Sequence, residues 1–227
     1  MMFAATETLQ RVVETDTMQG LSPQLKVALF LGAMAFISSA LVTMTAFTRI
    51  VIVLSFVRRA LATQEIPPTQ VIVGLSLFLT FFVMAPTASR IETEAIVPYL
   101  DGNIDGAQAF DTAKLAVQDF MLRQTRKRDI ALFAGIARIP SISTPQDTPM
   151  RVLIPAYVVS ELKTAFIMGF CVYIPFILID LVVSIILMSL GMMMMPPMVI
   201  STPFKLLLFV VVDGWVLIAQ TLTLSFR

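Results

Sequence analysis

Long stretches of the chain carry no charged residue. Residues 27–48 and 66–89 are uncharged over 22 and 24 positions, and residues 164–179 and 181–204 give 16 and 24 more on either side of Asp180. About 20 apolar residues are enough for a helix to cross a bilayer. The pattern therefore predicts four long hydrophobic helices, at about 25–57, 69–88, 152–190 and 198–225, arranged as two hairpins.

The stretch between the two hairpins is polar. Residues 90–151 hold eight acidic and eight basic residues, over half of the charges in the chain. Asp101-Gly102-Asn103 is typical of a turn, and Asp105 is suited to cap a following helix. We expect a small, mostly helical domain here.

These patterns predict an all-α polytopic membrane protein with four parts. They are an N-terminal segment that can form an amphipathic helix (1–24), a first hydrophobic hairpin (25–89), the polar domain (90–151) and a second hairpin (152–227). The first 20 residues lack the basic start and apolar run of a secretory signal peptide.

The basic residues give conflicting signals about orientation. Arg58 and Arg59 place the loop 58–68 in the cytoplasm, because loops on that side are enriched in Lys and Arg. The polar domain then lies outside the cytoplasm, although it has a basic run of its own at residues 123–128. Since long domains cross the membrane largely regardless of charge, we expect the domain in the periplasm.

Composition narrows the classes of function. Charged residues make up 14% of the chain, against about 25% in soluble domains. A net charge of +1 gives no basis for binding nucleic acid. The chain has no His, one Cys within an apolar run, and none of the common catalytic motifs. We therefore expect no metal, no cofactor and no enzymatic activity, while a small-solute transporter, an ion channel or an intramembrane enzyme remain alternatives.

Charged residues inside apolar segments are costly and are candidates for function. Such charges either pair and fix helix packing or handle protons or substrate. Asp180 lies about ten residues before the turn at 191–197 and Lys205 about eight after it, or about 15 and 12 Å along the two helices. Their matched depth predicts an ion pair, within the hairpin or with a neighbouring copy. The candidate charges are Arg49, Glu161, Lys163, Asp180, Lys205 and Asp213.

The turn of the second hairpin has no charged residue. It contains Met192, Met193, Met194 and Met195, between Gly191 and Pro196-Pro197. Irregular backbone is not tolerated in contact with lipid, so the turn should be buried in protein or line a cavity. Methionine is flexible and fills irregular gaps, so the run is either core filler or a deformable apolar collar around a pore.

Several segments together resemble the FliP family of type III export-gate proteins, over residues 36–226. The virulence-type injectisome counterpart is similar over the same span. The resemblance is carried by residues 45–54, 74–86, 151–156, 160–166, 174–176, 179–182 and 204–215, and by the methionine turn.

The resemblance implies a subunit of the flagellar export gate, in the bacterial inner membrane at the flagellar basal body. About five copies would assemble with FliQ and FliR, joined by FlhB and FlhA, and pass unfolded flagellar export substrates. Met192–Met195 would form the pore gasket, and Asp180 and Lys205 the intramembrane charge pair. Glu161 and Lys163 would begin the third helix. One departure is Ala62, where the family pattern has Gly, and we expect only a stiffer loop.

Overall fold

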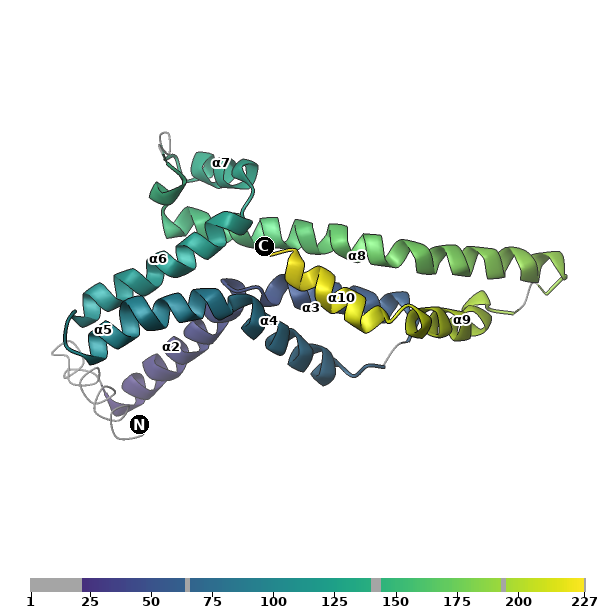
Figure 1. Ribbon diagram of the computed structural model, residues 1–227, viewed down its shortest axis with the longest axis horizontal. Helices are drawn as coiled ribbons and strands as arrows, with labels where there is room; N and C mark the ends of the chain where they lie inside the picture. Colours follow the sequence, from purple (N-terminus) through teal and green to yellow (C-terminus); the bar gives the residue numbers. More distant parts are fainter. Residues whose placement is uncertain (1–21, 64–65, 140–143, 193–194, 227) are drawn as a thin grey trace. The chain divides into compact units, whose positions relative to one another are not determined.

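The computed structural model describes residues 22–63, 66–139, 144–192 and 195–226, and not the side chains of residues 23, 33, 36–38, 40 and 41. The predicted N-terminal segment 1–24 thus lies almost wholly outside the described residues. All the regular secondary structure in the described part is helical, which confirms the all-α prediction (Figure 1). The chain forms two compact units, Met1–Leu41 and Val42–Arg227, and the first contains most of helix α2 (Pro23–Thr43).

The prediction of one helix over 25–57 was wrong. Helix α2 ends at Thr43, and α3 (Phe47–Ala60) begins after a short break. The Tyr157 hydroxyl donates a 2.8 Å hydrogen bond to the carbonyl oxygen of Thr45 in this break. The Thr45 hydroxyl accepts the backbone N–H of Phe47. These bonds satisfy polar groups that a helix break would otherwise leave unpaired.

The core lies between α3 and α8 (Met150–Ser189). Ile50, Val53, Leu54 and Val57 are buried at the spacing of one helical face. Beside them the ring of Phe56 lies against Gly169, where an added Cβ would be 2.6 Å from Phe56 Cγ. A glycine is therefore required for α3 and α8 to approach this closely.

The helix predicted at 69–88 runs further than expected. Helix α4 (Thr69–Ile91) continues through a π-helical turn (Glu92–Ile96) into α5 (Val97–Leu100). The change from apolar to polar sequence near residue 90 is thus not a break in the helix. Arg90, at the end of α4, pairs with Glu94 of the π-helical turn and with Asp119 of α6 (Gly106–Gln124).

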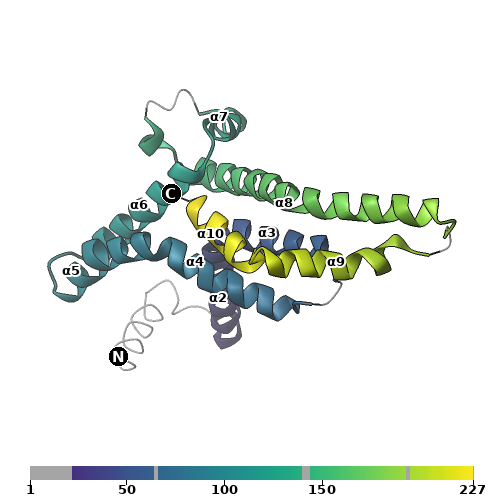
Figure 2. The same ribbon diagram turned by 45° about the vertical axis from the view of Figure 1, so that its right-hand side comes forward.

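Two local predictions for the polar region are confirmed. Asp105 accepts the backbone N–H of Gln108 at 2.7 Å and forms a capping box at the start of α6. The turn before it contains Gly102 at φ +73°. The chain continues through α7 (Lys127–Ile136) and a 3₁₀ turn (Pro145–Asp147), and α6 and α7 both pack on α8 (Figure 2).

The helix predicted at 152–190 is confirmed as α8, a single helix of 40 residues. The helix predicted at 198–225 is instead two, α9 (Pro197–Val211) and α10 (Gly214–Leu224), bent by 63°. Asp213 has φ +50° at the bend, a left-handed conformation that Asp and Asn adopt more readily than most residues. Gly214 is needed beside it, because an added Cβ would lie 2.3 Å from the Phe209 ring.

Ala62 also has a left-handed backbone, with φ +58°, directly after α3. A glycine would adopt this conformation without strain, whereas an L-residue loses about 1–2 kcal/mol there. The expectation that Ala62 only stiffens the loop was therefore incomplete, since the methyl group also strains the end of α3.

Two helices in the described part of the chain are long and apolar enough to cross a membrane. They are Thr69–Leu100, which joins α4 to α5, and α8, and the bent pair α9–α10 makes a third if it counts as one span. At about 1.5 Å per residue, α8 is about 60 Å long, twice the hydrocarbon thickness of a bilayer.

Candidate functional site

Arg49 and Glu161 form a buried ion pair between α3 and α8. Arg49 Nη2 lies 2.5 Å from Glu161 Oε1, and Arg49 Nε donates to Oε2 at 2.8 Å. The two side chains are 3% and 0% exposed. Both carboxylate oxygens are therefore used by one planar guanidinium, the arrangement in which an Arg–carboxylate pair is strongest.

The same guanidinium holds two further parts of the chain. Arg49 Nη1 donates to the carbonyl oxygen of Ser225 at 2.9 Å and to its hydroxyl at 3.0 Å. Arg49 Nη2 also donates to Gln124 Oε1 at 3.1 Å, and Arg49 Cζ lies 3.8 Å from the centroid of the Phe226 ring. We call Arg49, Glu161, Gln124, Ser225 and Phe226 the Arg49 cluster. It joins α3, α8, the end of α6 and the residues after α10.

The sequence indicated Arg49 and Glu161 as costly charges, but it did not predict that they pair with each other. Their opposite signs were the available signal. Relative depth is fixed by a turn only within a hairpin, and α3 and α8 are far apart in sequence. Gln124, Ser225 and Phe226 had no signal, because nothing in their local sequence distinguishes them.

The ion pair predicted in the second hairpin is present. Lys205 Nζ of α9 lies 2.5 Å from Asp180 Oδ2 of α8, and the Ser201 hydroxyl donates to Asp180 Oδ1. The side chain of Lys205 is 3% exposed and that of Asp180 is 38% exposed. The pair forms within one hairpin, so it does not require the neighbouring copy that the sequence left open.

The other two candidate charges are not brought into either group. Lys163 is exposed on α8, and the described residues include no ion-pair partner for it. Asp213 is exposed at the bend between α9 and α10, where its backbone conformation is the notable feature. Lys163 and Asp213 are thus separate from the two ion pairs.

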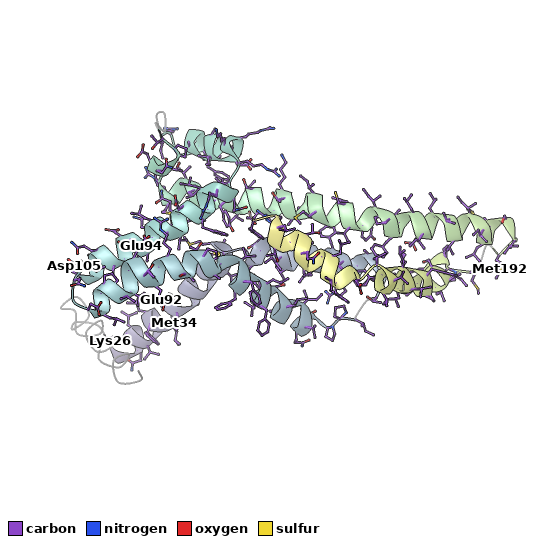
Figure 3. All side chains as sticks on the ribbon, viewed as in Figure 1. Lys26, Met34, Glu92, Glu94, Asp105 and Met192 are labelled. Atoms are coloured by element: carbon purple, nitrogen blue, oxygen red, sulfur yellow. The ribbon has the colours of Figure 1, made fainter. Side chains whose placement is uncertain are left out.

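Met192, the first residue of the methionine turn, lies just beyond the C-terminal end of α8 (Figure 3). Met193 and Met194 fall outside the described residues, and Met192 and Met195 are 41% and 42% exposed. Two backbone hydrogen bonds fix the end of α8. The N–H of Gly191 donates to the carbonyl oxygen of Met188, and the N–H of Met192 donates to that of Leu187. With Gly191 at φ +75°, this is the Schellman arrangement that ends many helices.

A second polar contact that the sequence did not indicate attaches α7 to α8. The Ser160 hydroxyl donates to Asp129 Oδ2 at 2.5 Å and accepts the backbone N–H of Arg126 at 3.1 Å. Arg126 also donates to the hydroxyl of Thr164. Ser160 directly precedes Glu161, so one turn of α8 holds both α3 and the polar region.

This arrangement is suited to holding helices together. The buried charges of α3, α8 and α9 are each paired and hydrogen-bonded, which is what allows them to remain in an apolar interior. Within the described ranges, no three His, Cys, Asp or Glu side chains lie close enough together to hold a metal ion.

Comparison with known proteins gives consistent matches. The FliP family model matches residues 30–222. The flagellar biosynthetic protein FliP of Bacillus subtilis (strain 168) is 50% identical over 208 residues, which cover 92% of this chain and 94% of that protein. The proteins of the same name from Pectobacterium carotovorum subsp. carotovorum and Aquifex aeolicus (strain VF5) are 55% and 46% identical, over 86% and 89% of this chain and 76% and 86% of their own lengths. Because the match extends over most of the chain at this level of identity, the chain belongs to the FliP family.

Proposed function

We propose that this chain is a structural subunit of the flagellar type III export gate and lines the channel through which unfolded flagellar proteins cross the inner membrane. The observation that carries the proposal is membership of the FliP family over residues 30–222, with relatives named for flagellar biosynthesis. The paired buried charges support a structural role, because they fix helix positions and leave no free acid or base among them.

The surface of the second hairpin supports a role in an assembly. Side chains on α8 and α9 are exposed around the helices, among them Leu178, Leu181, Val182 and Leu207 at 54–62%. Monomeric soluble proteins rarely expose such continuous apolar surface, so lipid or neighbouring subunits must cover it. A 60 Å helix leaves about half of its length beyond the bilayer core for neighbouring subunits to cover.

The proposed partners are further copies of this chain, about five by family resemblance, with FliQ and FliR and then FlhB and FlhA. We also propose that residues 90–151 lie on the periplasmic side of the membrane. Labelling of an Asn103→Cys variant by a membrane-impermeant thiol reagent, in a Cys171→Ala background, would test this prediction.

Co-purification tests the assembly. An affinity-tagged copy expressed with FliQ and FliR should elute as one large complex containing all three proteins and several copies of this chain. An isolated transporter would instead purify as a small oligomer and move solute without partners. Recovery of the chain alone, in cells where both partners are present and folded, would rule out the proposed role.

The methionine turn is proposed to act as the gasket of the channel. Met192 lies at the tip of the α8–α9 hairpin, and the sequence of the turn has no polar side chain to recognise a particular substrate. Export substrates are chemically diverse, and flexible thioether side chains can close by packing and yield to different sequences. An apolar constriction also blocks ions by excluding water.

Shortening these side chains should make the channel leak. Replacing Met192–Met194 with Ala removes most of the packing volume while keeping a compatible backbone. We expect assembled complexes to leak ions, with export partly retained, as measured by membrane potential and by secretion of a flagellar substrate.

The matched control replaces the same three residues with Leu, which is similar in volume and stiffer. This variant should leak little. Equal leakage from both variants, or none from the Ala variant despite normal assembly, would exclude a gasket here.

A further inference from the structure

Two charged residues of the second hairpin are not used by either ion pair. Lys163 of α8 and Asp213, between α9 and α10, have opposite charges, and neither has an ion-pair partner among the described residues. The other charges in the apolar parts of this hairpin belong to the two pairs described above. Lys163 and Asp213 are thus the charges that another molecule can still neutralise.

The carboxylate of Asp213 lacks the hydrogen bond that its position would usually give it. Asp213 is the N-cap residue of α10, where an Asp side chain commonly accepts a backbone N–H of the first turn. That bond goes with an extended backbone, whereas Asp213 is left-handed and its side chain makes no capping bond. The exposed carboxylate is therefore available to a cation from outside this chain.

Lys163 lies on the side of α8 that is turned away from the core. It follows Glu161 by two residues, and two residues turn an α-helix by about 200°. Because Glu161 faces α3, Lys163 lies on the opposite side of α8. Phe166 and Phe170, three and seven residues further on, share this side and are both exposed. The ammonium group thus lies within an exposed apolar surface.

Asp213 is also surrounded by exposed apolar side chains, among them Val210, Val211 and Trp215. Lipid would cover such side chains readily, but a charge in lipid is costly. An apolar protein surface would be costly in the same way, because a covered charge needs a partner. Whatever covers Lys163 or Asp213 should therefore bring the opposite charge.

We propose that Lys163 of one copy of this chain pairs with Asp213 of a second copy. Their opposite charges and shared apolar surroundings make each surface the complement of the other. The contact joins two different faces of the chain, so it is head-to-tail and can repeat from copy to copy. The inference rests on the proposed function only in that several copies assemble.

The position of the bend sets how neighbouring copies are offset. Gly214 and Cys171 line the same apolar pocket, so Asp213 lies beside that part of α8. Cys171 is eight residues beyond Lys163, or about 12 Å along the helix. Adjacent copies are therefore displaced along α8 by about 12 Å at most, since the lysine side chain covers part of this distance.

Cross-linking between copies tests the contact directly. Two differently tagged full-length chains, one Lys163→Cys and one Asp213→Cys, would be expressed together in a Cys171→Ala background, which removes the native cysteine. A short bis-maleimide applied to membranes should give a dimer that carries both tags. Either variant alone should give little dimer, because a head-to-tail contact does not bring identical positions together.

Charge reversal tests whether the pair stabilises the assembly. Lys163→Asp or Asp213→Lys alone sets like charges against each other, so the yield of oligomer in detergent should fall about tenfold or more. Combining both changes in one chain, or expressing the two single variants together, restores opposite charges and should recover most of the yield.

Two variants serve as controls, and a thermal melt of every variant checks that it is folded. Arg151→Asp reverses an exposed charge on the same helix, about 18 Å before Lys163, and should leave the yield unchanged. Asp213→Asn removes the charge but keeps a residue that tolerates the left-handed backbone, so its effect reports the charge alone.

Three results would overturn the proposed contact while leaving the proposed function intact. They are a normal yield of oligomer from both single reversals, a double exchange no better than the single ones, and a cross-link that does not require both cysteine variants. Single reversals that abolish binding of FliQ or FliR but leave the oligomer unchanged would show that these charges face another subunit. Absence of any self-association by the unaltered chain would overturn both proposals.

Discussion

Replacing Arg49 with alanine should lower the stability of the protein by about 3–5 kcal/mol, because Glu161 would remain as a buried carboxylate without a counter-ion. The change also removes the donors to Ser225 and Gln124, so the residues after α10 should detach from the core. Thermal unfolding of the purified protein and limited proteolysis near residues 222–226 would measure the two effects.

Matched variants separate charge from geometry. Arg49→Lys keeps the charge but loses the bidentate contact, so it should be intermediate. Glu161→Ala should be less damaging than Arg49→Ala, because the guanidinium keeps Ser225 and Gln124 as partners. The double variant Arg49→Met, Glu161→Met should be more stable than Arg49→Ala alone, since neither charge is then left buried and unpaired. If the double variant is as unstable as the sum of the two single Ala variants, the pairing is not what stabilises this core.

In the second hairpin, Asp180→Ala should be more damaging than Lys205→Ala. Lys205 is the more deeply buried partner, and loss of Asp180 leaves its ammonium group unpaired in an apolar setting. Loss of Lys205 leaves a carboxylate that is 38% exposed and still accepts Ser201. We expect a loss of about 3 kcal/mol or more for Asp180→Ala, and less for Lys205→Ala.

Exchange of the two charges tests the pair itself. Asp180→Lys with Lys205→Asp should recover more complex formation and more export than either single exchange, although Ser201 then faces a cation and recovery is incomplete. Yield of the proposed complex with FliQ and FliR, together with swimming motility, would be measured. A double exchange no better than the single ones would show that the two charges act separately.

Much of the fold follows from local sequence. The long uncharged run and the polar residues at its start were enough to predict both ends of α8 closely. Asp105 and Gln108 specify the start of α6 through bonds within four residues. Gly191 and Pro197 set the end of α8 and the start of α9 in the same way, because a left-handed glycine ends a helix and proline fits its first turn. The Asp180–Lys205 pair was predictable because a hairpin turn fixes the relative depth of its two helices.

The two helix breaks were not visible in the hydrophobic pattern. Residues 44–46 contain no charge and lie within the uncharged stretch 27–48. In the second break only Asp213 interrupts the apolar sequence. The first break holds the carbonyl oxygen of Thr45 against Tyr157, which is 112 residues away. The second allows the Phe209 ring to close over Gly214. Hydrophobicity measures what is buried and gives no information on where a backbone turns.

The sequence by itself thus determined the helical class, the length of α8, the caps at its turn and the charge pair inside one hairpin. The tertiary structure decided how Arg49 and Glu161 find each other across 112 residues, and how Ser160 brings Asp129 onto α8. The physical reason is the range of each interaction. Helix caps depend on hydrogen bonds within a few residues, and the pair in a hairpin depends on the rise along two helices joined by a short turn. Residues on helices that are distant in sequence become partners only when packing brings their faces together.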